Sequence, residues 1–327
     1  MKRWLLFLLL ASSALGAVSS ILNVSYDVTR EFYQEYNLAF AQAYEKRSGL
    51  APTVNLSNGG SSKQARAVID GLEADVVTMN QETDIDAIAK AGLIANHWKS
   101  RLPTNAAPYT TTIVFLVRKG NPKGIKDWGD LIAPGVSVIV PNPKTSGNGR
   151  YSYLAAWAYA KSRPGGSDAA AEEFVKELFK NAPILETGGR AATNTFVQKE
   201  IGDVLLTFES EVLQITRVFS PEAFEVVYPP LSILAEAPVS VVDKVVDRRG
   251  TRDLSTAYLE YLWSDQGQKL AVQFYFRPRS ERLLAENSAL FPPIRLVSVD
   301  DVFGGWDAAQ KAHFADGGYF DQIYQAK

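Results

Sequence analysis

The sequence predicts an α/β protein with two lobes joined by a hinge. Apolar, β-branched segments typical of buried strands alternate with segments of helical periodicity, an order that favours parallel sheets covered by helices. At several places a strand-like segment runs into a turn of small polar residues that opens a helix. Two strand-like segments, 110–117 and 239–242, are placed to carry the chain between lobes, and a chain of 327 residues favours two domains over one.

The first residues have the pattern of a secretory signal peptide. Lys2 and Arg3 precede an apolar run, and small residues surround a cleavage-like position at Gly16. We therefore expect residues 1–16 to be removed, which lowers the net charge from −2 to −4 and argues against nucleic-acid binding. The chain has no cysteine, which excludes disulfides, thiol nucleophiles and thiolate metal sites.

Three strands are expected in the N-terminal region, each followed by a polar turn and a helix. The first, 21–24, leads to Asp27, which is placed as the N-cap of a helix. The second leads to a Gly/Ser turn that contains Ser61, and the third, 75–78, leads to Asn80 and Gln81. In a parallel sheet these turns gather at the carboxyl edge, where α/β folds bind ligands.

The stretch 141–157 carries the strongest pattern of this kind. A β-branched strand at 136–140 ends in the turn Thr145-Ser146-Gly147-Asn148-Gly149, and a helical face follows. The first turn of a helix presents unsatisfied N–H groups and a partial positive charge, which together favour an anion. The alternative is an ordinary capped helix, because capping residues are common in such turns.

Two later junctions, at 184–190 and 203–211, repeat the pattern. Capping explains each junction alone but explains the whole set poorly, so the sequence favours a small polar or anionic ligand in a cleft. Arg150 and Arg190 lie just inside two of these turns, where each could clamp the anion directly or brace the loop from behind; we favour the brace.

Catalytic chemistry finds little support. His97 and His313 are far apart and each lies next to an aromatic residue, which favours structural or surface roles and argues against a zinc site. The common hydrolase, nucleotide-binding and metalloprotease motifs are absent. Glu209 and Glu211 could suggest an acid pair, but a spacing of two points them in different directions, so capping or solvated roles are favoured.

Several long motifs resemble the periplasmic sulfate/thiosulfate-binding proteins of ABC transporters. They are Asn23 to Glu31, Gly59 to Gln64, Phe115 to Pro122, Pro141 to Ala156, Asp203 to Glu211 and Val302 to Trp306, and the resemblance covers essentially the whole mature chain. It implies a type II periplasmic binding protein fold with the ligand in the cleft. The expected lobes are 17–106 with 237–276, and 107–236 with 277–327.

The resemblance also implies the ligand contacts. In this family a dehydrated dianion receives hydrogen bonds from uncharged donors, mostly backbone N–H groups, and these carry over to Asp27, Ser61, Ser146, Gly147, Asn148 and Gly189. Phe208 stands where sulfate binders have a tryptophan whose indole N–H reaches the anion, and Asn148 replaces a glycine. Asn80, Gln81, Arg150 and Arg190 are expected behind these contacts.

The local sequences around Asn80, Asn148 and Phe208 resemble those of the thiosulfate-binding branch. This resemblance implies a preference for thiosulfate, with sulfate also bound. Terminal sulfur is a larger and weaker acceptor than oxygen, so a phenyl face suits it better than an indole donor. The implied partners are the permease and ATPase of an importer. The carrier itself is expected to be periplasmic and monomeric and to need no cofactor. Three alternatives stay open: a molybdate or tungstate carrier, an enzyme acting on sulfate esters, and a chemosensory receptor.

Overall fold

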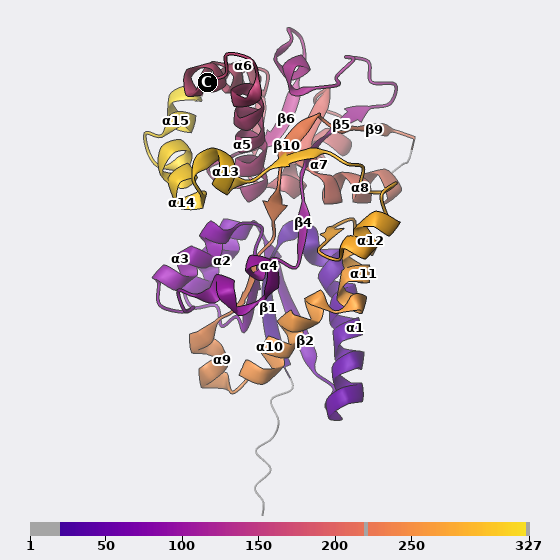
Figure 1. The fold of residues 1–327 in the computed structure, drawn as a ribbon, viewed down its shortest axis with the longest axis vertical. Coiled ribbons are helices and arrows are strands. Elements are labelled where there is room, and N and C mark those ends of the chain that lie inside the picture. Colours follow the sequence, from indigo (N-terminus) through magenta and orange to yellow (C-terminus); the bar gives the residue numbers. More distant parts are fainter. Residues whose placement is uncertain (1–19, 219–221, 325–327) are drawn as a thin grey trace, which may run out of the picture.

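The computed structural model describes residues 20–218 and 222–324, with the side chains of 217 and 218 left out. The expected signal peptide, residues 1–16, lies outside the described residues. The chain forms two α/β lobes, one above the other in Figure 1, linked by segments that run between them. Within the described ranges no helix is long and apolar enough to span a membrane.

Lobe I is built on a four-stranded sheet in the order β12-β3-β1-β2. β1 (Ser20–Tyr26) pairs in parallel with β2 (Thr53–Gly59) and β3 (Val76–Thr78), and β12 (Val239–Val241) is an antiparallel edge strand. The sheet is buried on both faces: Val76 packs in one apolar cluster, and Val24 and Val77 pack in another.

The sheet of lobe I is covered by helices from two stretches of sequence (Figure 1). The longest, α1, buries a row of aromatic residues, Phe32, Tyr33, Tyr36 and Phe40. The helices are η1 (Asp27–Thr29), α1 (Arg30–Ser48), α2 (Ser61–Ile69), α3 (Glu82–Lys90), η2 (Trp98–Arg101), the left-handed turn α4 (Pro103–Ala106), α9 (Asp243–Arg249), α10 (Arg252–Glu260), η4 (Tyr261–Trp263) and α11 (Asp265–Gln273).

Lobe II is built on a five-stranded sheet in the order β7-β6-β8-β5-β9. The strands are β5 (Ile113–Arg118), β6 (Val138–Pro141), β7 (Ile184–Glu186), β8 (Val204–Phe208) and β9 (Phe224–Val227). β6 runs parallel to β7 and β8, whereas β5 runs antiparallel to β8 and β9.

The central helix of lobe II is α5 (Gly147–Ser162), which is buried from Gly147 to Ala160. It lies against α6 (Asp168–Lys180), and the last segments of the chain pack beside both helices (Figure 1). The other elements are η3 (Trp128–Ile132), α7 (Gly189–Val197), α8 (Glu209–Val218), α13 (Val299–Phe303), α14 (Trp306–Ala309), η5 (Gln310–Phe314) and α15 (Tyr319–Ile323); a parallel pair, β10 (Leu231–Ile233) and β14 (Arg295–Val297), lies beside the sheet.

A small sheet, β11-β4-β13, forms where the chain passes between the lobes. It contains β4 (Tyr109–Thr111), β11 (Ala235–Glu236) and β13 (Arg277–Pro278), and α12 (Glu281–Glu286) follows it. Arg277 makes a bidentate ion pair with the buried Glu209 at the end of β8, with N–O distances of 2.6 and 2.8 Å. The pair therefore ties this linking sheet to lobe II.

Three details differ from the expectations. The expected strand 110–117 is two strands, because Thr112 turns its hydroxyl to the carbonyl of Ile233 (2.7 Å) where the chain changes sheets. The expected crossing strand 239–242 is instead the edge strand β12, and the three strands β4, β11 and β13 form the sheet where the chain passes between the lobes. Asp27 is not an N-cap: it lies in the first turn of η1. The residue ranges given for the lobes stay a prediction.

Candidate anion-binding site

The junctions singled out in the sequence meet at one small cavity between the lobes. Its volume is about 10 Å³, which is about the space that a single water molecule needs. All seven residues expected to contact the ligand line it, together with one residue expected behind them: Asp27, Ser61, Ser146, Gly147, Asn148, Gly189, Phe208 and Asn80. The structure thus brings the expected residues together, while their contact with a ligand stays a prediction.

The first turn of α5 supplies donors from lobe II. Ser146 is the N-cap, and its Oγ accepts a hydrogen bond from the N–H of Gly149 (3.3 Å). Its own N–H donates to the carbonyl of Asn142 (2.9 Å), so its free donor is the hydroxyl hydrogen and not the backbone group. The N–H groups of Gly147 and Asn148 find no acceptor among the described residues, as expected for a helix start.

The Asn148 side chain is hydrogen-bonded to neighbouring residues of lobe II. Its Nδ2 donates to Thr207 Oγ1 (2.7 Å), and Thr207 donates in turn to Glu211 Oε2 (2.8 Å). Thr193 donates to the other oxygen of Glu211 (2.7 Å). Burial raises the pKa of Glu211, and the nearby charge of Asp27 adds to the effect. This chain of hydrogen bonds holds the Asn148 side chain in place, and the backbone N–H of Asn148 is left without an acceptor among the described residues.

The first turn of α7 adds a further donor and requires glycine. A Cβ at Gly189 would lie 2.9 Å from Asn148 Nδ2 and 3.1 Å from Glu211 Oε2, too close for either neighbour to stay in place. The N–H of Gly189 has no acceptor among the described residues. The next N–H, that of Arg190, donates to the carboxylate of Asp27 and so links this helix to lobe I.

Ser61 opens α2 on the side of lobe I. Its hydroxyl donates to Asp84 Oδ2 (2.5 Å) and accepts from the N–H of Asn80 (3.2 Å). Burial raises the pKa of Asp84, whereas the hydrogen bonds from Ser61 and Ser62 and the charge of Arg150 lower it. With its hydroxyl occupied, Ser61 has its backbone N–H left to offer a ligand.

Asp27 brings a carboxylate to the edge of the cavity. Burial raises its pKa, and the charge of Arg190 together with the N–H groups of Val28, Arg190 and Asp27 itself opposes that rise.

Neither arginine lines the cavity. Arg150 is buried, its Nε donates to the carbonyl of Pro143 (3.0 Å), and burial lowers its pKa. Arg190 reaches Glu31 of lobe I at 3.4 Å. This arrangement favours bracing over direct clamping. Gln81 also lies behind the cavity, with its Nε2 directed to Ser62 (3.4 Å).

A family model described as bacterial extracellular solute-binding protein matches residues 30–277. The chain is 57% identical to the thiosulfate-binding protein of Pseudomonas aeruginosa over 97% of both chains, and 52% identical to the sulfate-binding protein of Escherichia coli over 99% of both. The chain belongs to this family of solute-binding proteins. Among solved structures, the sulfate-binding protein SubI of Mycobacterium tuberculosis H37Rv matches 90% of this chain and 99% of its own, with 34% identity and a TM-score of 0.82.

Phe208 distinguishes the cavity of this solute-binding protein from one formed by donors alone. The residue ends β8 with 2% of its surface exposed, and its ring meets Tyr151 edge-on at 5.8 Å between centroids. A phenyl ring brings no hydrogen-bond donor. This wall of the cavity is therefore apolar.

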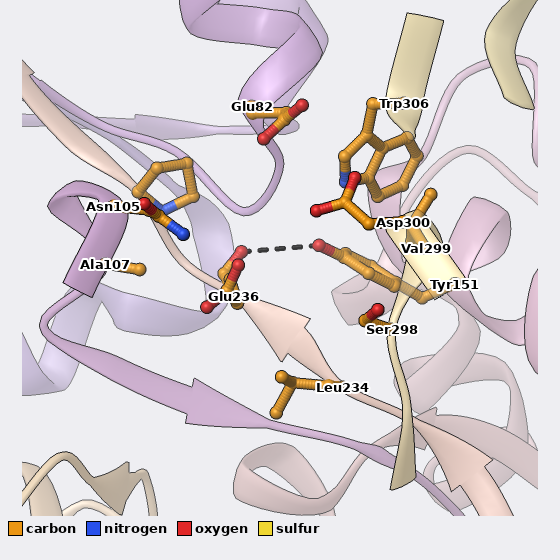
Figure 2. A pocket seen from close by; sticks show the side chains of 11 residues that line it. Glu82, Asn105, Ala107, Tyr151, Leu234, Glu236, Ser298, Val299, Asp300 and Trp306 are labelled. Atoms are coloured by element: carbon orange, nitrogen blue, oxygen red, sulfur yellow. Dashed lines mark hydrogen bonds between the residues drawn. The ribbon is translucent and has the colours of Figure 1, made fainter. Parts of the chain in front are cut away.

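A second pocket between the lobes, of about 30 Å³, has the opposite character. Figure 2 shows the carboxylates of Glu82, Glu236 and Asp300 around it, and the hydroxyl of Tyr151 donating to the carbonyl of Glu236 (3.3 Å). Carboxylates repel an anion, so this pocket is a poor place for a dianion. The described residues hold no group of side chains suited to a metal ion.

One residue expected behind the ligand contacts, Asn80, lines the cavity, and its contact with a ligand stays a prediction like that of the others. The signal was present in its position, because it is the second residue after β3, at the carboxyl edge of the sheet.

Proposed function

We propose that this protein binds thiosulfate and sulfate in the cavity between its lobes and delivers them to an ABC importer. The observation that carries the proposal is the set of uncharged donors that converge there: the hydroxyl of Ser146 and the backbone N–H groups of Ser61, Gly147, Asn148 and Gly189. Relatives named as sulfate- and thiosulfate-binding proteins support the same ligands.

The donor set is strong enough for useful affinity. A hydrogen bond to a charged group contributes about 1.5–3 kcal/mol. Five such bonds, less the cost of removing the anion from water and closing the lobes, leave room for the roughly −8 kcal/mol that corresponds to a micromolar dissociation constant. Since no arginine has to contact the ligand, release does not require breaking a buried ion pair.

Thiosulfate is the preferred ligand in this proposal. The wall at Phe208 has no hydrogen-bond donor. Terminal sulfur is a weaker acceptor than oxygen, so placing sulfur against this wall costs less hydrogen-bond energy than placing an oxygen there. The three oxygens still face the donors of the helix starts. The protein acts as a monomeric periplasmic carrier, and it performs no chemistry on the anion.

Isothermal titration calorimetry tests the proposal. Exhaustively dialysed protein is titrated separately with thiosulfate, sulfate, phosphate and molybdate. One site per chain is expected, with micromolar or tighter binding of thiosulfate and sulfate. Phosphate should bind at least about 100-fold more weakly, because its P–O–H group needs an acceptor in a site made mainly of donors. Heat from neither sulfur anion would reject the proposed function.

A further inference from the structure

Asn80 has an unpaired polar group inside the cavity. The residue follows β3 in lobe I, only 7% of its surface is exposed, and its side chain lines the cavity. Its backbone is held, because its N–H donates to Ser61 Oγ (3.2 Å). The side-chain Oδ1, in contrast, is fully buried with no hydrogen-bond partner. A buried amide oxygen without a partner costs free energy in the arrangement where the two lobes meet around the cavity.

The same amide reaches across to lobe II. A Cβ built at Gly147 would lie 2.1 Å from Asn80 Oδ1, and 2.8 and 2.9 Å from its Cγ and Nδ2. The amide therefore lies directly against the first residue of α5, and only glycine at 147 allows this approach. One side chain of lobe I thus meets the donor-bearing helix start of lobe II at the cavity wall.

We propose that the Asn80 side chain is a direct ligand of the bound anion and donates an amide N–H to one of its oxygens. The inference rests on the proposed function, since it names a further contact in the same cavity. An amide carries two donors and an acceptor on one planar group, and a half-turn of that group exchanges them. A sulfur dianion only accepts hydrogen bonds, so it selects the orientation that presents the N–H.

This role fits the charge and the geometry of the site. The amide is neutral, so it adds a donor without adding a cation that would slow release. It belongs to lobe I, whereas Gly147, Asn148 and Gly189 belong to lobe II, so its bond to the anion forms only when both lobes surround the ligand. Phe208 offers no donor, and Asn80 supplies one from the opposite lobe.

The test compares Asn80→Leu with the parent protein by calorimetric titration of sodium thiosulfate and sodium sulfate. Leucine has a similar size but no donor. Both anions should bind about 10- to 100-fold more weakly, since both offer oxygens to the amide. The melting temperature without ligand should stay the same or rise, because the Asn80 side-chain oxygen has no hydrogen-bond partner that the variant could remove.

A purely structural role gives a different result. If Asn80 only packs against Gly147, the ligand-free melting temperature should fall together with the affinity, and that outcome overturns the proposal. Affinities within threefold of the parent overturn it as well. A parent protein that binds neither anion rejects the proposed function instead, so the two failures are distinguishable.

Two further variants secure the comparison. Thr78→Val is the matched control: Thr78 is a buried polar residue on β3 whose hydroxyl donates to Asn23 Oδ1 (3.0 Å), and it does not line the cavity. It should lower the melting temperature and leave both affinities within about twofold. Asn80→Asp keeps the shape of the side chain if leucine prevents folding, and its carboxylate should weaken both anions more than about 100-fold. Binding of this variant within tenfold of the parent overturns the proposal.

Discussion

Replacing Gly147 with alanine separates ligand binding from stability. Gly147 is the first residue of α5 and has no left-handed backbone, so alanine fits the helix itself. An alanine in such a position is expected to stabilise the ligand-free protein slightly, by up to about 1 kcal/mol, because it restricts the unfolded chain. The added methyl group, however, would lie 2.1 Å from Asn80 Oδ1 of the other lobe.

The size of the effect follows from this contact. Carbon and oxygen atoms do not approach to 2.1 Å, so either the Asn80 amide turns out of the cavity or the lobes stop about 1 Å short of closure. Overpacking of a filled site costs about 1–3 kcal/mol. If the whole cost falls on the closed, ligand-bound state, the affinity for thiosulfate drops about 5- to 150-fold.

Calorimetric titration and thermal unfolding without ligand measure the two quantities. Gly60→Ala is the control for the added methyl group, because Gly60 lies at the start of α2 with an ordinary φ of −57° and a Cβ there would meet nothing within 4 Å. That variant should change the affinity less than about threefold. If Gly147→Ala binds thiosulfate within twofold of the parent, the close approach of the two lobes at this point does not exist.

Three further predictions concern other parts of the molecule. Ser146→Glu should reduce the affinity for both sulfur anions more than about 100-fold, since a carboxylate replaces a donor inside a buried anion site; a folded variant that binds within tenfold of the parent would show that the site lies elsewhere. Phe208→Trp should shift the thiosulfate-to-sulfate affinity ratio toward sulfate by about tenfold, because the indole N–H adds a donor for oxygen and crowds the larger sulfur. Competition titrations measure this ratio, and an equal loss for both ligands would mean that the larger ring only overpacks the end of β8. His313 is buried beside Trp157, and burial lowers its pKa to about 4 from an ordinary 6.5. The folded protein favours the neutral ring of His313. The contribution of this ring to the free energy of unfolding is therefore complete above about pH 6.5, and about 2–3 kcal/mol of it is lost as the pH falls toward 4. Urea unfolding at about pH 7 and pH 4.5 should show this loss in the parent and a smaller one in His313→Phe, and identical losses in both would exclude His313 as the cause.

The local junctions could be predicted from the sequence because local chemistry determines them. The glycines and hydroxyls at 59–62, 145–149 and 187–189 mark helix starts, and α2, α5 and α7 begin there. The parallel arrangement of their strands follows from the alternation of strand and helix, and it is what places the three starts at one edge in each lobe.

Features that depend on tertiary contacts could not be predicted in this way. β13 is only two residues long and ends in a proline, so the sequence shows no periodic pattern that would predict a strand there. The strand forms because Arg277 reaches Glu209 and β4 lies beside it. Ser146 and Ser61 look alike in sequence, yet Asp84 engages the hydroxyl of Ser61 and leaves that of Ser146 free. The position of Asn80 in the cavity depends on a glycine 67 residues later in the chain.

The central claim is that the anion binds between the lobes and draws them together. Small-angle X-ray scattering of dialysed protein, with and without saturating thiosulfate, tests it most directly. The account predicts a smaller radius of gyration with thiosulfate or sulfate and no change with phosphate at the same concentration. Calorimetric binding of thiosulfate with an unchanged radius of gyration would contradict it, because the ligand would then occupy a site within one lobe.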